Sequence, residues 1–120
     1  MPIPFEGLRT VIYATPDLDA SKRWWTALLG IEPYFDQPFY VGFHVAGYEL
    51  ALMPDADPAD GAIVYWGVRD VAEAVTTAEA AGSTEHSPLA DVGDGIVTAT
   101  VRTPDGSILG LIHNPNFSLG

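Results

Sequence analysis

Residues 9–30 read RTVIYATPDLDASKRWWTALLG and carry the pattern that decides the fold. The first part of this stretch is rich in β-branched and aromatic residues, which is typical of a strand, and a Pro-Asp turn follows it. Apolar side chains then recur at helical spacing, with Asp17 or Asp19 as a capping residue at the start and Gly30 at the position of a helix C-terminal glycine. The stretch therefore predicts a strand joined directly to a helix.

The second half of the chain repeats this order. Residues 62–68 read as a strand, and the apolar face of a helix follows over residues 71–81. Shorter strands are expected at residues 34–35, 40–45 and 48–53 in the first half and at residues 96–102 and 107–113 in the second half.

Matching turns in the two halves show where the copies differ in length. Asp17 and Asp70 are 53 residues apart, whereas Gly47 and Gly106 are 59 apart, and we place the extra residues in a loop at 91–95. Residues 54–61 form an acidic linker rich in Pro and Gly.

The predicted fold class is α+β, a single domain of two similar modules, each with one helix on a four-stranded sheet. The modules span about residues 6–53 and 62–114. A helix covers only one face of each sheet, so we expect the two uncovered faces to enclose a ligand cleft.

Composition narrows the range of functions. The 120 residues are 48% hydrophobic, enough for one folded core. The formal net charge of −11 argues against nucleic acid or an anionic membrane as partner and favours a cationic or neutral ligand. The chain has no cysteine, which excludes disulfides and thiolate metal sites. No signal-like or membrane-spanning apolar run is present, so a cytoplasmic location is expected.

A family resemblance rests on the segments around the two repeats. These are the first strand, Pro16-Asp17-Leu18, the aromatic-bearing helix that ends Leu28-Leu29-Gly30-Ile31, and the turn at residues 103–107, Thr-Pro-Asp-Gly-Ser. Over about residues 8–112 the chain resembles the vicinal oxygen chelate superfamily of glyoxalase I, extradiol dioxygenases, fosfomycin-inactivating enzymes and bleomycin- and mitomycin-binding resistance proteins. The resemblance implies two βαβββ modules that form an open half-barrel cleft, usually completed in a homodimer.

The resemblance also indicates where metal ligands would stand. Members that use a metal take ligands from the first and last strands of each module, and those positions fall here on Thr10, Ala51, Ile63 and Gly110. None of these side chains carries an imidazole or a carboxylate, so no metal and no cofactor is expected. Glu49 lies two residues from Ala51 and thus on the same strand face, which leaves a metal site with shifted ligands as an open alternative.

The candidate site consists of residues expected to face the cleft, among them an aromatic cluster that follows the first helix. Candidate ligand-binding residues are Thr10, Ile12, Phe35, Phe39, Tyr40, Phe43, His44, Glu49, Tyr65 and Gly110. Candidate catalytic residues are Glu49 and His86, either of which could act as a general base.

Three functions follow from these residues and from the resemblance. The first is metal-independent binding or sequestration of an aromatic or cationic small organic molecule in an apolar cleft, as in the antibiotic resistance members. The second is a metal-independent isomerase or lyase that uses Glu49 or His86 as its base. The third is a glyoxalase- or dioxygenase-like metalloenzyme with shifted ligands.

Overall fold

The computed structural model describes residues 2–118, which divide into two compact units. One unit is residues 10–63, called the first module from here on; the other, called the second module, is residues 2–9 together with 64–118. The N-terminal segment thus groups with the second half of the chain. One contact that ties it there is a hydrogen bond of 2.7 Å from the Glu6 amide to the Gly67 carbonyl.

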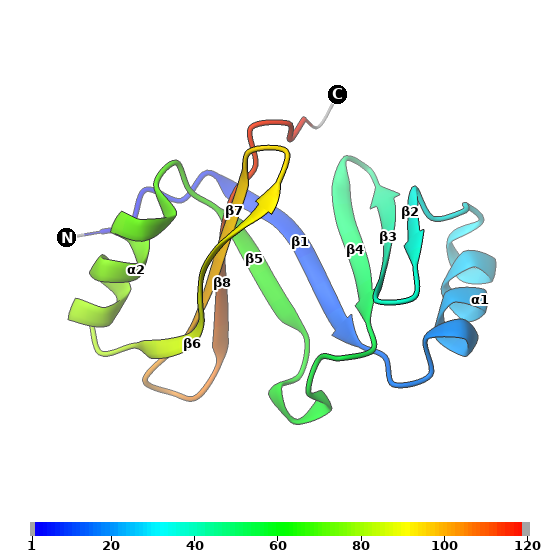
Figure 1. Cartoon of the computed structure of the whole chain (residues 1–120), viewed down its shortest axis with the longest axis horizontal. Coiled ribbons are helices and arrows are strands. Elements are labelled where there is room, and N and C mark those ends of the chain that lie inside the picture. The colour runs from blue at the N-terminus through cyan, green and yellow to red at the C-terminus, as the bar shows by residue number, and fades with distance from the viewer. Residues whose placement is uncertain (1, 119–120) are drawn as a thin grey trace. The chain divides into compact units, whose positions relative to one another are not determined.

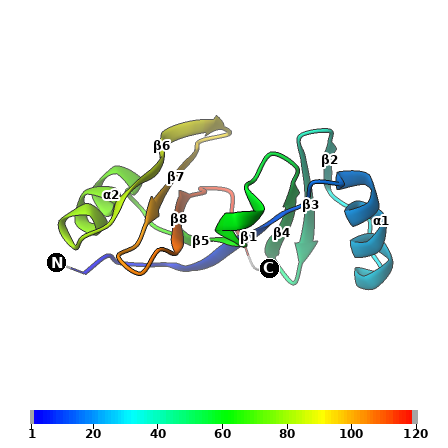
Figure 2. The same cartoon turned by 90° about the horizontal axis from the view of Figure 1, so that it is seen from below.

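The first module is one βαβββ unit in which β1 runs parallel to β4 and the strand order is β2-β3-β4-β1 (Figures 1 and 2). Its elements are β1 (Gly7–Ala14), α1 (Leu18–Leu29), β2 (Phe35–Gln37), β3 (Tyr40–Val45), β4 (Tyr48–Met53) and the short 3-10 helix η1 (Pro58–Asp60). The first three residues of β1, up to Arg9, group with the second module.

The ends of α1 are fixed by the residues that the sequence singled out. The Asp17 carboxylate accepts a hydrogen bond of 3.1 Å from the Ala20 amide. Gly30 adopts a left-handed conformation with φ of 71°, which glycine reaches without steric cost, and its amide bonds to the Thr26 carbonyl. The prediction of this helix is therefore confirmed.

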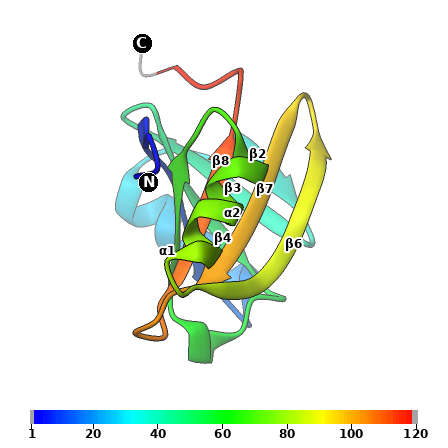
Figure 3. The ribbon, with the colours of Figure 1, turned by 90° about the vertical axis from the view of Figure 1, so that its left-hand side faces the viewer.

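The second module repeats the plan, with β5 parallel to β8 and the strand order β5-β8-β7-β6. Its helix packs on β6, β7 and β8 (Figure 3), and the Asp70 carboxylate caps it through the Glu73 amide at 3.0 Å. Its elements are β5 (Ile63–Gly67), α2 (Val71–Ala80), β6 (Thr84–Gly93), β7 (Ile96–Arg102) and β8 (Ile108–His113).

Each module has its own apolar core between helix and sheet. In the first module the core consists of Val41, Phe43 and Leu52, packed against Trp25 and other residues of α1. In the second module it consists of Val68, Val71, Ala74, Ala99 and Leu111. In each module the helix covers one face of the sheet and does not cover the opposite face.

Strand β6 differs from the sequence prediction, which placed a loop insertion at residues 91–95. The extra residues extend a hairpin instead, because β6 continues to Gly93 and pairs with β7 through three register shifts. β6 is the outer strand of its sheet, nearly all of its residues are exposed, and it contains Pro88. An exposed edge strand needs no apolar alternation and tolerates proline, so it carries little sequence signal.

The fold class is α+β, as predicted, with two α-helices and eight strands in the described residues; β6 is the strand that was not predicted. No helix between residues 2 and 118 is both long enough and apolar enough to span a membrane.

Candidate functional site

The sheet of the first module has one face turned away from α1, which we call the Glu49 face. Strand alternation directs Val41 and Phe43 toward the helix and Tyr40, Gly42 and His44 the other way. Thr10 lies opposite Glu49 across the β1–β4 pair, and His44 lies opposite Glu49 across the β3–β4 pair. The Glu49 face consists of Thr10, Ile12, Phe35, Tyr40, Gly42, His44, Glu49 and Ala51, with Tyr34 at its edge.

Glu49 is the polar centre of this face, because three hydroxyl groups donate to its carboxylate. Thr10 Oγ1 donates to Oε1 at 2.6 Å, and Tyr40 donates its hydroxyl to the same oxygen at 2.7 Å. The hydroxyl of Tyr34 donates to Oε2. Hydrogen bonds to an ionised carboxylate are strong, so the three donors hold Glu49 in one position.

Tyr34 precedes β2 and reaches the carboxylate across Gly42. The Tyr34 amide donates to the Gly42 carbonyl at 3.0 Å, which places the ring over β3. A Cβ on Gly42 would lie 2.7 Å from Glu49 Oε2 and 2.9 Å from Tyr34 Cε1, so only glycine leaves room for this contact. Partial burial, the hydrogen bond to Glu49 and the charge of Glu49 raise the pKa of Tyr34 above its ordinary value of 10.0, and its hydroxyl remains a donor at neutral pH.

Exposed aromatic rings lie beside the carboxylate. Phe35 makes edge contacts with Phe39 at 6.2 Å and with Tyr40 at 5.9 Å between ring centroids, and Tyr34 stacks on His44 at 3.9 Å. Tyr34 and Phe39 keep 52% and 59% of their surface exposed. A negative group thus stands next to aromatic surface that a ligand can reach.

The structure brings most of the predicted first-module residues together. Thr10, Tyr40 and Glu49 share hydrogen bonds, and Phe35 and Phe39 are in ring contact. His44 lies opposite Glu49, and Ile12 is on the same face but buried opposite Ala51.

Phe43 does not belong to the Glu49 face, contrary to the sequence expectation. It is fully buried in the core beneath α1, because it occupies the helix-facing parity of β3. Tyr34 and Gly42 belong to the Glu49 face but were not predicted from the sequence. Tyr34 stands within the aromatic run, but only the pairing of β2 with β3 shows that it reaches Glu49.

The remaining predicted residues lie in the second module, on neighbouring strands. Tyr65 pairs with Gly110 across β5 and β8, and its ring covers that glycine, since a Cβ on Gly110 would lie 2.7 Å from Tyr65 Cγ. Gly110 pairs with Thr100, whose Oγ1 is 2.7 Å from His86 Nδ1. Burial raises the pKa of Tyr65.

A divalent metal does not fit the positions that the resemblance assigns. Thr10, Ala51, Ile63 and Gly110 present no imidazole or carboxylate, Thr10 donates its hydroxyl to Glu49, and the Tyr65 ring fills the space over Gly110. Within residues 2–118, no three His, Asp or Glu side chains are grouped so that they could hold a metal ion.

A hollow of about 660 Å³ lies elsewhere in the second module. Its walls come from residues 2–4, from the start of α2 and from strand residues that include Val97 and His113. None of the predicted site residues lines it, so it does not bear on the Glu49 face.

Comparisons with known proteins agree with the fold. The model of the Glyoxalase/Bleomycin resistance protein/Dioxygenase superfamily matches residues 7–111, whereas no curated protein matches the chain. A member of that superfamily from Vibrio splendidus 12B01 shares 20% identity at a TM-score of 0.65, over 88% of this chain and 97% of its own.

Two further solved structures have similar folds. Streptomyces coelicolor methylmalonyl-CoA epimerase shares 16% identity at a TM-score of 0.70, over 95% of this chain and 98% of its own. The Mn(II)-bound glyoxalase from Novosphingobium aromaticivorans shares 19% identity at a TM-score of 0.71, over 91% of this chain and 39% of its own. At these identities the similarity shows the fold alone.

Proposed function

Because the chain belongs to the glyoxalase/bleomycin resistance protein/dioxygenase superfamily, we propose that it binds a small aromatic cation on the Glu49 face without a metal. The observation that carries this proposal is the Glu49 carboxylate, held by three hydroxyls beside the exposed rings of Tyr34 and Phe39. The role is binding or sequestration, which needs affinity and no reaction.

The hydrogen bonds of Glu49 leave room for one more donor. A carboxylate offers about four lone-pair positions. Thr10 and Tyr40 occupy two on Oε1, and Tyr34 occupies one on Oε2. An ammonium or amidinium N–H can therefore bond to Oε2. In the ion pairs seen within residues 2–118, Arg9 pairs with Glu6 and Lys22 with Asp36, so no basic side chain neutralises Glu49.

Aromatic surface and charge both favour such a ligand. The faces of tyrosine and phenylalanine rings attract cations, and planar molecules stack on them. The net charge of −11 raises the concentration of cations near the protein. At the Glu49 face, an anion would be repelled by the carboxylate of Glu49 and by the negative net charge of the protein.

The test compares three ligands of the same shape by fluorescence titration. These are proflavine, a cation; acridine, neutral at mildly alkaline pH; and acridine-9-carboxylate, an anion. We expect the cation to bind best, and Glu49→Gln to weaken it about tenfold, which corresponds to about 1.4 kcal/mol, while leaving acridine unchanged.

Glu79→Gln on the exposed surface of α2 is the matched control, because it removes the same charge from a residue of the second module that is not part of the Glu49 face. It should leave all three affinities as they are. The proposal fails if Glu49→Gln and Glu79→Gln weaken the cation equally, or if neutral acridine binds the wild type as tightly as proflavine.

A second candidate is a metal-independent isomerase or lyase with Glu49 as general base. The contact between the Tyr34 hydroxyl and Glu49 supports it, since the pair joins a proton donor to a proton acceptor. A similar fold also occurs in a methylmalonyl-CoA epimerase. This candidate predicts that a bound ligand exchanges a C–H hydrogen with deuterated water. Glu49→Gln should stop the exchange while the ligand still binds. A ligand that binds the wild type without exchange would favour sequestration over catalysis.

A further inference from the structure

Arg9 in the second module is a mostly buried cation with few partners. Its side chain is 15% exposed. The Cζ atom lies 3.9 Å from the centroid of the Phe117 ring. A Cβ on Gly67 would come within 2.7 to 2.9 Å of Nε, Cζ and Nη2, so the guanidinium lies flat against the backbone of β5.

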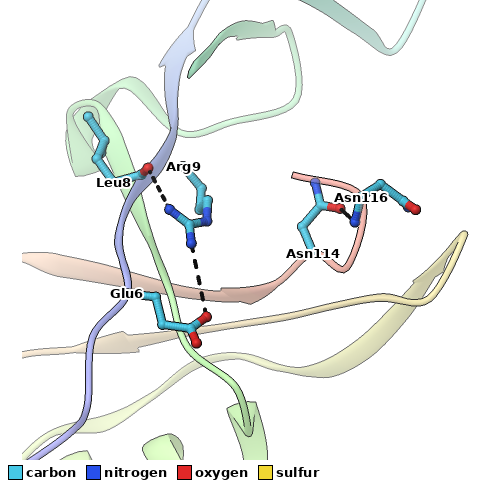
Figure 4. Close-up of polar contacts among 5 residues, drawn as sticks. All are labelled: Glu6, Leu8, Arg9, Asn114 and Asn116. Carbon is cyan, nitrogen blue, oxygen red and sulfur yellow. Dashed lines mark hydrogen bonds and ion pairs between the residues drawn. The ribbon is translucent and has the colours of Figure 1, made fainter. Parts of the chain in front are cut away.

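The polar contacts of Arg9 use only part of its donor capacity (Figure 4). Nη1 donates to the Leu8 carbonyl at 3.2 Å, and Nη2 is 4.0 Å from Glu6 Oε1, beyond hydrogen-bond distance. A guanidinium carries about five N–H donors. Thr15 Oγ1 is the single buried side-chain polar atom without a partner in residues 2–118, so the unused donors of Arg9 reach solvent.

This arrangement differs from that of Lys22, another basic residue of the chain. Lys22 forms a close ion pair with Asp36 at 3.1 Å. The carboxylate nearest Arg9, that of Glu6, is 44% exposed and stays at the limit of an ion pair. The side chain of Arg9 is thus largely removed from water, but no carboxylate forms a close ion pair with its N–H groups.

We propose that the N–H edge of Arg9 is a binding site for an oxyanion, a carboxylate or a phosphate carried by a small organic molecule. A guanidinium presents paired donors that match the two oxygens of such a group, and contact with the Phe117 ring fixes its plane. Burial of the side chain makes an uncompensated charge costly, which favours an incoming anion.

The surroundings supply a surface for the rest of the molecule. Tyr65 lies two residues before Gly67 on β5, on the same face of the strand and roughly 7 Å away along it. Its ring already covers Gly110 and offers an aromatic neighbour to a ligand anchored on Arg9. This proposal rests on residues of the second module alone and does not depend on the function proposed for the Glu49 face.

The test follows the Nε–Hε signal of Arg9 by NMR while sodium benzoate or inorganic phosphate is titrated against chloride at constant ionic strength. The signal is assigned by its loss in Arg9→Lys. We expect a saturable shift of this signal, and not of the other arginine signals, with benzoate, phosphate or both; the anion that saturates first identifies the carboxylate or the phosphate source.

Glu6→Gln sharpens the test, because it removes the nearest competing carboxylate and leaves the packed side chain of Arg9 in place. It should tighten anion binding about two- to fivefold, the strength of an exposed ion pair. Glu32→Gln in the first module changes the charge equally and should have no effect. The proposal is overturned if neither anion gives a saturable shift in the wild type and in Glu6→Gln, or if Glu32→Gln tightens binding as much.

Discussion

Gly42→Ala tests whether the Glu49 face depends on the space above one glycine. Gly42 is buried on β3 and its φ is not positive, so the backbone accepts alanine. The new Cβ would lie 2.7 Å from Glu49 Oε2 and 2.9 Å from Tyr34 Cε1. Tyr34 is half-exposed and free to swing outward, so we expect its ring to move and its hydrogen bond to Glu49 to break.

The size of the effect follows from two opposing contributions. A hydrogen bond to a charged group is worth about 1.5–3 kcal/mol. Replacing a strand glycine by alanine stabilises the fold by about 0.5–1 kcal/mol, because the unfolded chain has less backbone entropy to lose. The free energy of unfolding should therefore fall by about 1–2 kcal/mol, which urea denaturation resolves.

A double-mutant cycle with Tyr34→Phe separates loss of the hydrogen bond from general crowding. Tyr34→Phe removes the hydroxyl and keeps the ring. If alanine acts by displacing Tyr34, the double variant loses the bond only once, so its cost falls short of the sum of the single costs. Additive costs, or a Gly42→Ala protein as stable as the wild type, would refute this account of Gly42.

Two further predictions concern stability. Folding raises the pKa of Tyr34, so its contribution to the free energy of unfolding is full below the ordinary value of 10.0 and is lost as the pH rises beyond it. Urea unfolding should show that the stability of the wild type falls above pH 10.0 and that the stability of Tyr34→Phe falls less. An equal fall of stability with pH in both proteins would contradict the role of Tyr34. Thr15→Val removes a buried hydroxyl that has no partner, so thermal unfolding should show a gain of about 1 kcal/mol, and a loss would mean that the hydroxyl is bonded.

The helices and most strands could be predicted because their signals are local. Asp17, Gly30 and Asp70 act on amides and carbonyls a few residues away, and the apolar periodicity of each helix follows from the core it covers. The repeated order of such signals predicts two similar modules, each with a strand, a helix and further strands. Superfamily membership over residues 7–111 agrees with that prediction.

The site was harder to predict because it depends on register between strands. Shifting a strand by one residue exchanges its two faces, and the sequence alone could not show that Phe43 faces α1 while His44 faces Glu49. Tyr34 reaches Glu49 only because β2 folds back on β3 at Gly42. β6 was missed because an exposed edge strand needs no apolar pattern.

Register also explains how the two copies of one plan differ chemically. Thr10 and Glu49 lie opposite each other in the first module, and the same offsets of 53 and 59 residues place Ile63 and Ile108 at these positions in the second. An isoleucine pair can neither hold a carboxylate nor supply a hydroxyl to one. The charge that we propose as a ligand site in the second module is instead that of Arg9, which comes from the N-terminal segment and lies against Gly67. If both proposals hold, a few side chains set the charge of each proposed site, negative at Glu49 and positive at Arg9, so ligand groups of opposite charge should distinguish the two modules.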